Sequence, residues 1–380
     1  MIGGGATGLG TAVDAASRGY RTVLLERDDF GSGTSSRSTK LAHGGIRYLA
    51  QRDFSLVREA LRERNRMLRN APHLVRKRSF VIPVGGWAAK LYYGAGLKLY
   101  DLLGGARDFG RSRMLSRDAT LQAVPTLKQQ RLYGGLEYFD GQFDDARMAI
   151  CLARTAADYG AIVINHIGVS CLLKTGNRTT GVEAIDQLSG ETLSVSGKVV
   201  VNAAGIFVDE IGALDNSDAE PTLAFSQGSH IVLDRRLLPG ESALVIPATK
   251  DGRVLFAIPW HGVVLAGTTD IPVPKPLVSP KPAPDEVDFL LTHLEEYLVD
   301  KPTNGDVRSV FAGIRPLLAG AGGAKTSSLS RSHAVFTSEN GLVTVAGGKW
   351  TTYRQMAEDA VNRAAIVGGL ARRACVTSDL

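Results

Sequence analysis

The chain has 380 residues, 44% of them hydrophobic and 22% charged, with a formal net charge of +6. This length permits two domains. The positive charge permits an anionic small substrate or an anionic membrane surface as partner. Nucleic acid is less favoured, because the sequence has no long Lys/Arg run interleaved with aromatic residues. The three cysteines lack CxxC spacing, which argues against a disulfide framework and a zinc site, and no apolar run approaches the roughly 18 residues of a spanning helix.

The first predicted elements surround a glycine-rich start. After MIGGGATGLG, residues 11–19 predict a short helix, and residues 20–26 predict a strand that ends in Glu26. A loop of small polar residues fills 28–48. Residues 54–70 then predict an amphipathic helix that is stopped by Pro72.

The middle of the chain alternates strands and helices. We expect a strand at 76–84, an amphipathic helix with an aromatic face at 87–105, and then a strand, an Asp-Gly turn at 140–141 and a helix over 132–160. Further strands are predicted at 161–166, 169–174, 181–187, 193–205, 230–234, 243–248, 253–260 and 263–270. A proline-rich crossover at 271–286, a helix at 287–299, a strand at 307–317 and a strand–glycine turn–helix unit at 341–365 complete the pattern.

Nucleotide-type segments therefore stand at the start, middle and end of the sequence, with strand-rich segments between them. This order predicts an α/β fold of two interleaved domains. We expect 1–75, 145–215 and 306–380 to form a Rossmann-like domain, and 76–144 and 216–305 to form a mostly antiparallel substrate or cap domain.

Gly3, Gly5 and Gly8 form the pattern G-x-G-x-x-G. In a nucleotide fold the first glycine permits the tight turn, the second lets the backbone approach a pyrophosphate, and the third packs helix on strand. Glu26 ends the next strand, where a carboxylate accepts the ribose hydroxyls. A plain glycine turn is the competing interpretation, and the following helix and acidic residue favour the nucleotide.

NAD and FAD proteins share this pattern, so other features must separate them. The polar loop GTSSRSTKLAHGG offers small residues that let the backbone lie against an isoalloxazine ring and hydroxyls that reach phosphate and ribitol. A helix that begins after Gly347 and Gly348 would stabilise negative charge on reduced flavin. Both features favour FAD.

Several longer motifs occur in a fixed order: TSSRSTKLAHGGIRYL, YFDGQFDDAR, QGSHIVL, AGTTD, FAGIRPL and AGGKWTTYR. Together with GGGATGLGTAVDAASRG they closely resemble the FAD-dependent glycerol-3-phosphate dehydrogenases of the bacterial respiratory and mitochondrial type. The resemblance covers nearly all of residues 1–365. It implies the glucose-oxidase and amino-acid-oxidase type of flavoprotein fold, oxidation of sn-glycerol 3-phosphate to dihydroxyacetone phosphate, and electron transfer to a quinone.

The chain departs from this family in three places. Only Ile2 stands where the family has an apolar strand before the glycines, and the chain ends at residue 380, where the family continues into a helical domain. The first departure is expected to threaten folding, because that strand is central to the parallel sheet; the second is expected to affect stability, oligomerisation or partner contact. At 202–207 the chain has NAAGIF, where the family has Asn-Ala-Thr-Gly-Pro.

The nucleotide pattern and the resemblance together give the predicted FAD site. Its residues are Gly3, Gly5, Gly8, Glu26, Thr34, Ser35, Ser36, Lys40, Leu41, His43, Gly44, Gly45, Val169, Ala203, Ala204, Gly205, Gly313, Gly348, Lys349 and Thr351.

A dianionic phosphate that carries a secondary alcohol requires cations and a base. The motifs that carry the resemblance offer Arg47, Tyr48, His230, Arg315, Arg331 and Lys349. An arginine fork suits phosphate, although a lone arginine is ordinarily a surface residue. His230 is the natural base because an unperturbed histidine titrates near neutrality, although a core histidine is commonplace.

The helix over 87–105 carries Trp87, Tyr92, Tyr93 and Tyr100 together with Lys90 and Lys98. It suits a membrane interface beside a quinone pool, and packing on its own domain is the simpler interpretation. With no signal peptide before the glycines, we expect a cytoplasmic chain that contacts the inner face of the cytoplasmic membrane peripherally.

Other interpretations stay open from the sequence. An amino-acid or glycine oxidase shares the flavoprotein superfamily, but a carboxylate substrate requires fewer cations. A truncated, non-catalytic flavoprotein fragment would explain the short start. The sequence decides neither between quinone and oxygen as acceptor nor between monomer and homodimer.

Overall fold

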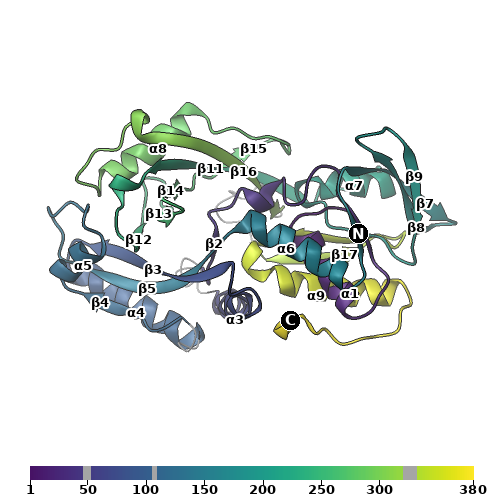
Figure 1. Ribbon diagram of the computed structural model, residues 1–380, viewed down its shortest axis with the longest axis horizontal. Coiled ribbons are helices and arrows are strands. Elements are labelled where there is room, and N and C mark those ends of the chain that lie inside the picture. The colour runs from purple at the N-terminus through teal and green to yellow at the C-terminus, as the bar shows by residue number, and fades with distance from the viewer. Residues whose placement is uncertain (46–52, 105–108, 320–331) are drawn as a thin grey trace.

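The computed structural model describes residues 1–45, 53–104, 109–319 and 332–380 (Figure 1). One half of the molecule contains a parallel sheet with helices α1 (Ala6–Ser17), α6 (Asp145–Asp158) and α9 (Tyr353–Val367). The other half contains a large, mostly antiparallel sheet. The chain crosses between the halves several times, so the predicted α/β class with interleaved parts is confirmed.

The parallel sheet is joined at its centre by Ile2. Strands β1 (Val23–Leu25) and β6 (Ile162–Ile164) pair in parallel, as do β10 (Val201–Asn202) and β18 (Val343–Gly347). Ile2 forms parallel bridges to Leu25 on one side and Asn202 on the other. Its amide donates to the Val201 carbonyl at 2.8 Å, and its side chain is buried. A very short segment thus occupies the position at which the sequence predicted a missing strand.

Three further elements complete this half. Strand β17 (His333–Thr337) pairs antiparallel with β18. A small antiparallel sheet is built from β7 (Ile167–Thr175), β8 (Arg178–Asp186) and β9 (Thr192–Ser196), and α7 (Val208–Asp215) follows β10. Helix α1 packs between α6 and α9, where Leu9, Leu24 and Met148 are buried in one apolar cluster. This packing fixes the N-terminus of α1 at the edge of the parallel strands.

The large sheet runs in the order β15-β11-β14-β13-β12-β3-β5-β2, with β16 beside β11 and β4 beside β5. Its strands are β2 (Leu41–Ala42), β3 (Val75–Val84), β4 (Arg113–Leu115), β5 (Gly134–Phe143), β11 (Leu223–Asp234), β12 (Ala243–Ile246), β13 (Leu255–Trp260), β14 (Val263–Gly267), β15 (Ile271–Val273) and β16 (Val307–Leu318). Helices α3 (Phe54–Asn70), α4 (Trp87–Gly104), α5 (Arg117–Ala123) and α8 (Pro284–Glu295) pack around it.

The predicted Asp-Gly turn at 140–141 is wrong. Both residues lie inside β5, where Asp140 pairs with Arg78 and Gly141 pairs with Lys77 of β3. Asp140 does not need a turn to satisfy its carboxylate, because Arg64 and Tyr100 bond to it in the core. Glycine suits the next position, because a Cβ at Gly141 would stand 2.9 Å from the Ala42 carbonyl oxygen.

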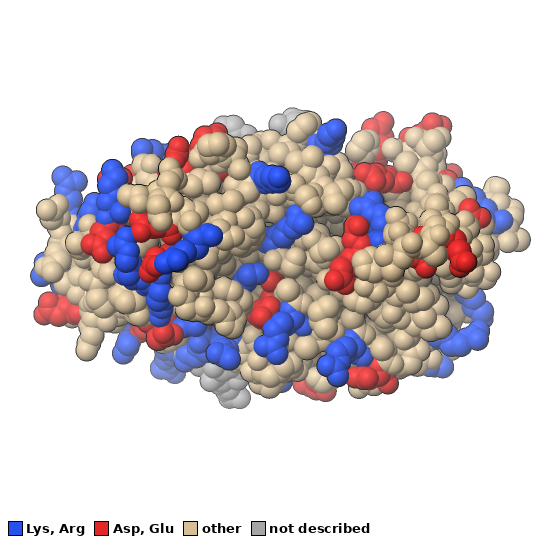
Figure 2. All heavy atoms as spheres, turned by 45° about the horizontal axis from the view of Figure 1, so that its top comes forward, with Lys and Arg blue, Asp and Glu red and all other residues tan. Residues whose placement is uncertain are grey.

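Surface charge is mixed on the face that Figure 2 shows, where Lys and Arg are interspersed with Asp and Glu. Within the described ranges, no helix has both the length and the apolar character that a bilayer crossing requires.

Candidate active site

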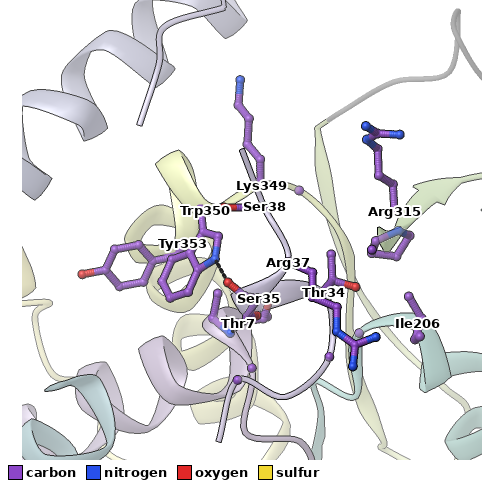
Figure 3. Close-up of a pocket in the computed structure, with 18 of the residues that line it drawn as sticks. Thr7, Thr34, Ser35, Arg37, Ser38, Ile206, Arg315, Lys349, Trp350 and Tyr353 are labelled. Atoms are coloured by element: carbon purple, nitrogen blue, oxygen red, sulfur yellow. Dashed lines mark hydrogen bonds between the residues drawn. The ribbon is translucent and has the colours of Figure 1, made fainter. Parts of the chain in front are cut away.

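A cavity of about 800 Å³ lies between the parallel sheet and the large sheet. Its walls come from the α1 turn, the 31–45 segment, the 203–207 turn after β10, strands β11 and β16, and the turn that precedes α9. Figure 3 shows Thr7, Thr34 and Ser35 at one side of this cavity, with Arg315 and Lys349 extending away from them.

The glycines of the first turn are required by close backbone contacts. Gly3 has φ +103°, and a Cβ there would stand 2.6 Å from the Ala203 carbonyl oxygen. A Cβ on Gly8 would stand 1.9 Å from the Gly3 carbonyl oxygen, so helix and strand meet there without a side chain. The N-cap residue Gly5 has no side chain, and the Ser35 hydroxyl accepts from the Ala6 amide at 2.9 Å. Gly5, Ala6 and Thr7 line the cavity, so the N-terminus of this helix adjoins it, as an anionic pyrophosphate requires.

Glu26 lies at the end of β1, on the cavity wall. Its carboxylate accepts a hydrogen bond from the Gly4 amide at 2.5 Å and one from the Asp28 amide at 2.8 Å. These bonds fix the carboxylate beside the glycine turn, where remaining lone pairs can accept hydroxyl protons.

The polar loop forms a second wall. The Thr34 hydroxyl donates to the Ile314 carbonyl at 2.6 Å, and the Trp350 indole donates to the Ser35 carbonyl at 2.7 Å (Figure 3). The loop is thus bonded both to β16 and to the turn before α9. Lys40 is turned away from this wall into an ion pair of 2.5 Å with Asp145, the buried first residue of α6.

Arg315 on β16 is a cation that the large sheet presents to the cavity. Its guanidinium donates to the Thr268 hydroxyl at 2.8 Å and to the Thr269 carbonyl at 3.0 Å, and lies 3.5 Å from the Asp270 carboxylate. Its side chain is 20% exposed. The partners orient the planar fork while Asp270 compensates part of its charge.

His230 on β11 lies near Arg315 and is 2% exposed. Its Nε2 lies 2.9 Å from the Thr39 hydroxyl, and its ring stacks on Phe311 at 4.8 Å. Burial, the largest cause, and the positive charges of Arg315 and Lys40 together lower the pKa of His230 from 6.5 to about 3. The expectation of a titration near neutrality was therefore wrong: without substrate this imidazole is neutral throughout the physiological range.

The turn before α9 brings Lys349 to the cavity. Gly347 and Gly348 both have left-handed φ angles, 73° and 79°, and a short 3-10 turn, Trp350–Thr352, precedes α9. A Cβ on Gly348 would stand 2.4 Å from the Met356 sulfur, so glycine is required there. The helix therefore begins at Tyr353, four residues later than the double glycine suggests.

Most of the predicted site residues do line this one cavity. They are Gly3, Gly5, Glu26, Thr34, Ser35, Leu41, His43, Gly45, Val169, Ala203, Ala204, Gly205, His230, Gly313, Arg315, Gly348, Lys349 and Thr351. Gly8, Ser36, Lys40 and Gly44 are not among its lining residues. Arg47, Tyr48 and Arg331 lie outside the described residues.

Several lining residues were not anticipated from the sequence. Arg37 and Thr39 stand inside the same polar loop motif, so the motif itself was a usable signal. The aromatic residues Phe80, Tyr138 and Phe256 line the cavity from three different strands. Only the register of the sheet brings these aromatic rings together.

Comparisons with known proteins agree with this geometry. A model of the FAD dependent oxidoreductase (DAO) family matches residues 1–354. A mitochondrial glycerol-3-phosphate dehydrogenase of Macaca fascicularis is 46% identical over 381 residues, covering 96% of this chain and 52% of that protein. One of Arabidopsis thaliana is 44% identical over 394 residues, covering 100% of this chain and 62% of that protein.

Solved structures show the same fold. The glycerol-3-phosphate dehydrogenase from Bacillus halodurans, complexed with FAD, is similar with a TM-score of 0.80 and 33% identity, covering 99% of this chain and 66% of that chain. A glycine oxidase from Geobacillus kaustophilus shares the fold with a TM-score of 0.70 at 18% identity, covering 98% of this chain and 94% of that chain. The present chain spans about half the length of the mammalian relatives, 52% in the macaque case.

The glycine turn, the acidic strand end and the long cavity define a dinucleotide-binding flavoprotein fold. The chain belongs to the FAD dependent oxidoreductase family. FAD fits the groups present, because the N-terminus of α1 at the cavity wall suits its pyrophosphate and Glu26 suits its ribose. The similarity to glycerol-3-phosphate dehydrogenases, predicted from the motifs, is confirmed by the relatives' identity.

Proposed function

We propose that this protein oxidises sn-glycerol 3-phosphate to dihydroxyacetone phosphate with FAD as the hydride acceptor. The observation that carries the proposal is the presence of Arg315 on β16 and His230 on the neighbouring strand β11, both on the cavity wall. The names of the relatives that share almost the whole chain support the substrate.

Each residue has a distinct part in the proposed reaction. Arg315, held by Thr268 and Asp270, binds the anionic substrate and holds its C2 carbon in position. His230 is neutral, so Nε2 accepts the hydroxyl proton as the C2–H bond breaks. The dianionic phosphate offsets the positive charge of Arg315 and Lys40. Substrate binding therefore raises the pKa of the imidazole.

Bound FAD supplies the acceptor of the C2 hydride, so that the alcohol loses one hydride and one proton and becomes the ketone. Lys349 at the turn before α9 adds positive charge near the developing anion. Arg47, Tyr48 and Arg331 complete the proposed set as predictions from the family motifs.

We also propose a quinone as the final electron acceptor and peripheral membrane contact through α4. Trp87, Leu91 and Tyr92 on this helix are 66%, 55% and 67% exposed, while Leu97 and Tyr100 pack into the core. Lys90 and Lys98 donate to the carbonyls of Leu115 and Ser112. The apolar side chains therefore carry this part of the proposal.

A dye-linked assay tests the substrate. Purified protein reconstituted with FAD should reduce an artificial acceptor with sn-glycerol 3-phosphate and should show no comparable rate with glycine or L-proline. Arg315→Met should raise KM for glycerol 3-phosphate by about 100-fold, the loss expected for one charge-assisted bidentate partner. A rate with glycine that exceeds the rate with glycerol 3-phosphate would make the protein an amino-acid oxidase.

A further inference from the structure

A buried polar network meets the cavity wall at Asp140. Asp140 on β5 lines the cavity and is 2% exposed. The Tyr100 hydroxyl of α4 lies 2.9 Å from Oδ1 and 2.8 Å from Oδ2 of this carboxylate, and Arg64 of α3 donates to Oδ1 at 2.6 Å. Three separate elements therefore meet at one carboxylate.

The same network reaches the backbone of the His43–Gly45 segment. The Gly44 amide donates to the Tyr100 hydroxyl at 2.9 Å and lies 3.4 Å from Asp140 Oδ1. The tyrosine thus accepts from Gly44 and donates to Asp140, which is a directional chain. On its other side the segment is tied to the turn before α9, because the His43 amide donates to the Thr351 hydroxyl at 3.3 Å.

Gly44 packs so closely against Tyr100 that a side chain at position 44 would clash. A Cβ on Gly44 would stand 2.5 Å from the Tyr100 hydroxyl and 2.3 Å from a Leu61 methyl carbon. Gly44 itself is not a lining residue, but its neighbours His43 and Gly45 are. Any shift of the tyrosine hydroxyl must therefore move the cavity wall on both sides of Gly44.

We propose that Tyr100 and Asp140 are a positioning pair that fixes the His43–Gly45 backbone against the bound flavin and links its placement to helix α4. This goes beyond the proposed reaction, because it concerns the cofactor environment and needs no substrate. A fully satisfied buried network specifies one geometry. Burial raises the pKa of Asp140, and the charge and hydrogen bond of Arg64 oppose that rise.

The link to α4 gives the pair a further consequence. Tyr100 is buried on the inner face of α4, while Trp87, Leu91 and Tyr92 of the same helix are exposed. A displacement of the helix is transmitted through one hydroxyl to Gly44. The Tyr100 side chain thus connects the outer surface of α4 to the cavity wall at Gly44.

Tyr100→Phe tests the pair, because it removes the hydroxyl and keeps the ring that packs on Tyr138 at 6.2 Å. The matched control is Tyr93→Phe, which removes a hydroxyl from the same helix outside the network. Each protein is prepared with FAD, and its visible flavin circular dichroism, FAD dissociation constant and flavin midpoint potential are measured without substrate. Tyr100→Phe is expected to change the flavin dichroism and weaken FAD about 10-fold, whereas Tyr93→Phe matches wild type.

Two results would overturn the proposal. One is wild-type dichroism, affinity and potential in Tyr100→Phe. The other is a loss of thermal stability that is equal in apoprotein and holoprotein with an unchanged flavin spectrum, because the network is then only part of the core. If Tyr100→Phe does not fold, Asp140→Asn takes its place with the same measurements and the same two contrary results. None of these measurements depends on glycerol 3-phosphate, so the proposed substrate can fail independently.

Discussion

Gly228 on β11 lies directly against the guanidinium of Arg315 on β16, where a Cβ on the glycine would stand 2.2 Å from Arg315 Nη2. A second glycine does the same for the histidine, since a Cβ on Gly267 would stand 2.3 Å from His230 Cδ2. Glycine at positions 228 and 267 therefore leaves room for Arg315 and His230, the two groups that the proposed reaction needs.

Gly228→Ala should displace Arg315 without unfolding the protein. The guanidinium is a flexible end, so the strand can keep its pairing while the fork loses its alignment with Thr268. We expect KM for glycerol 3-phosphate to rise at least about 10-fold, equivalent to one charged hydrogen bond, with a smaller effect on bound FAD. Steady-state kinetics on the dye-linked reaction measure this change.

The control is Gly212→Ala on α7, where an added Cβ meets nothing within 4 Å. Alanine is the better helix former, so this protein should be as stable as wild type or slightly more stable. An unchanged KM in Gly228→Ala would show that Arg315 does not bind the substrate from this position.

Glu26→Gln should weaken FAD. The carboxylate accepts hydrogen bonds from the backbone amides of Gly4 and Asp28. In glutamine an NH2 group replaces one oxygen, so one of these amides would face another donor. Charge-assisted hydrogen bonds contribute about 1.5–3 kcal/mol, so the FAD dissociation constant should rise at least about 10-fold. Fluorescence titration of apoprotein with FAD measures it; an unchanged constant would remove Glu26 from the cofactor site.

His230 should make the folded protein less stable in acid. Its pKa falls from 6.5 to about 3 on folding, so between these values the unfolded chain binds one proton more than the folded chain. Stability attributable to this group is complete above pH 6.5 and is lost as pH falls toward 3. The free energy of unfolding of His230→Gln should therefore decline less between pH 7 and pH 4.5 than that of wild type.

Urea denaturation at the two pH values measures this difference in the apoprotein. His261→Asn is the control, because His261 is exposed and asparagine tolerates its φ of 42°. Parallel pH dependence in wild type and His230→Gln would contradict the burial of a neutral histidine at this position.

Arg354→Met should destabilise the fold. Arg354 on α9 donates to both oxygens of the buried Glu63 on α3, at 2.6 and 3.2 Å, and to Glu358 at 2.8 Å. Its removal leaves Glu63 in the core with a weakened set of partners, at a cost of about 3 kcal/mol in unfolding free energy. The Arg236 side chain, which pairs with Asp300, is 52% exposed. Arg236→Met should therefore lower the unfolding free energy by less than about 1 kcal/mol.

A double variant, Glu63→Leu with Arg354→Met, should recover a large part of that loss, since the buried charge is removed along with its partner. Equal, small losses in Arg354→Met and Arg236→Met would show that the core pair contributes no more than a surface pair.

The sequence predicted those parts of the site that depend on local chain geometry. The glycine turn, Glu26 at the end of β1 and the turn before α9 each follow from a few adjacent residues, and the structure has all three. Lys40 shows where such reasoning fails: its motif suggests the cofactor, but the lysine pairs with Asp145, more than 100 positions later.

The remaining features depend on strand register, which a single sequence does not specify. Gly228 faces Arg315 because β11 and β16 pair over many residues across a gap of about 80 positions, and one slip would move every side chain to the other face. Asp140 and Gly141 form an Asp-Gly pair, which is typical of a turn. The Asp140 carboxylate is instead hydrogen-bonded by residues of α3 and α4 that lie far away in the chain. Tertiary partners thus override the local signal.

The most direct measurement is the anaerobic absorbance spectrum of the FAD-loaded protein during titration with sn-glycerol 3-phosphate. Hydride transfer predicts that the oxidised flavin band bleaches with a stoichiometry of one substrate per flavin, and that equal additions of glycine leave it unchanged. A flavin band that persists in excess glycerol 3-phosphate, while dithionite still bleaches it, would contradict the proposed reaction.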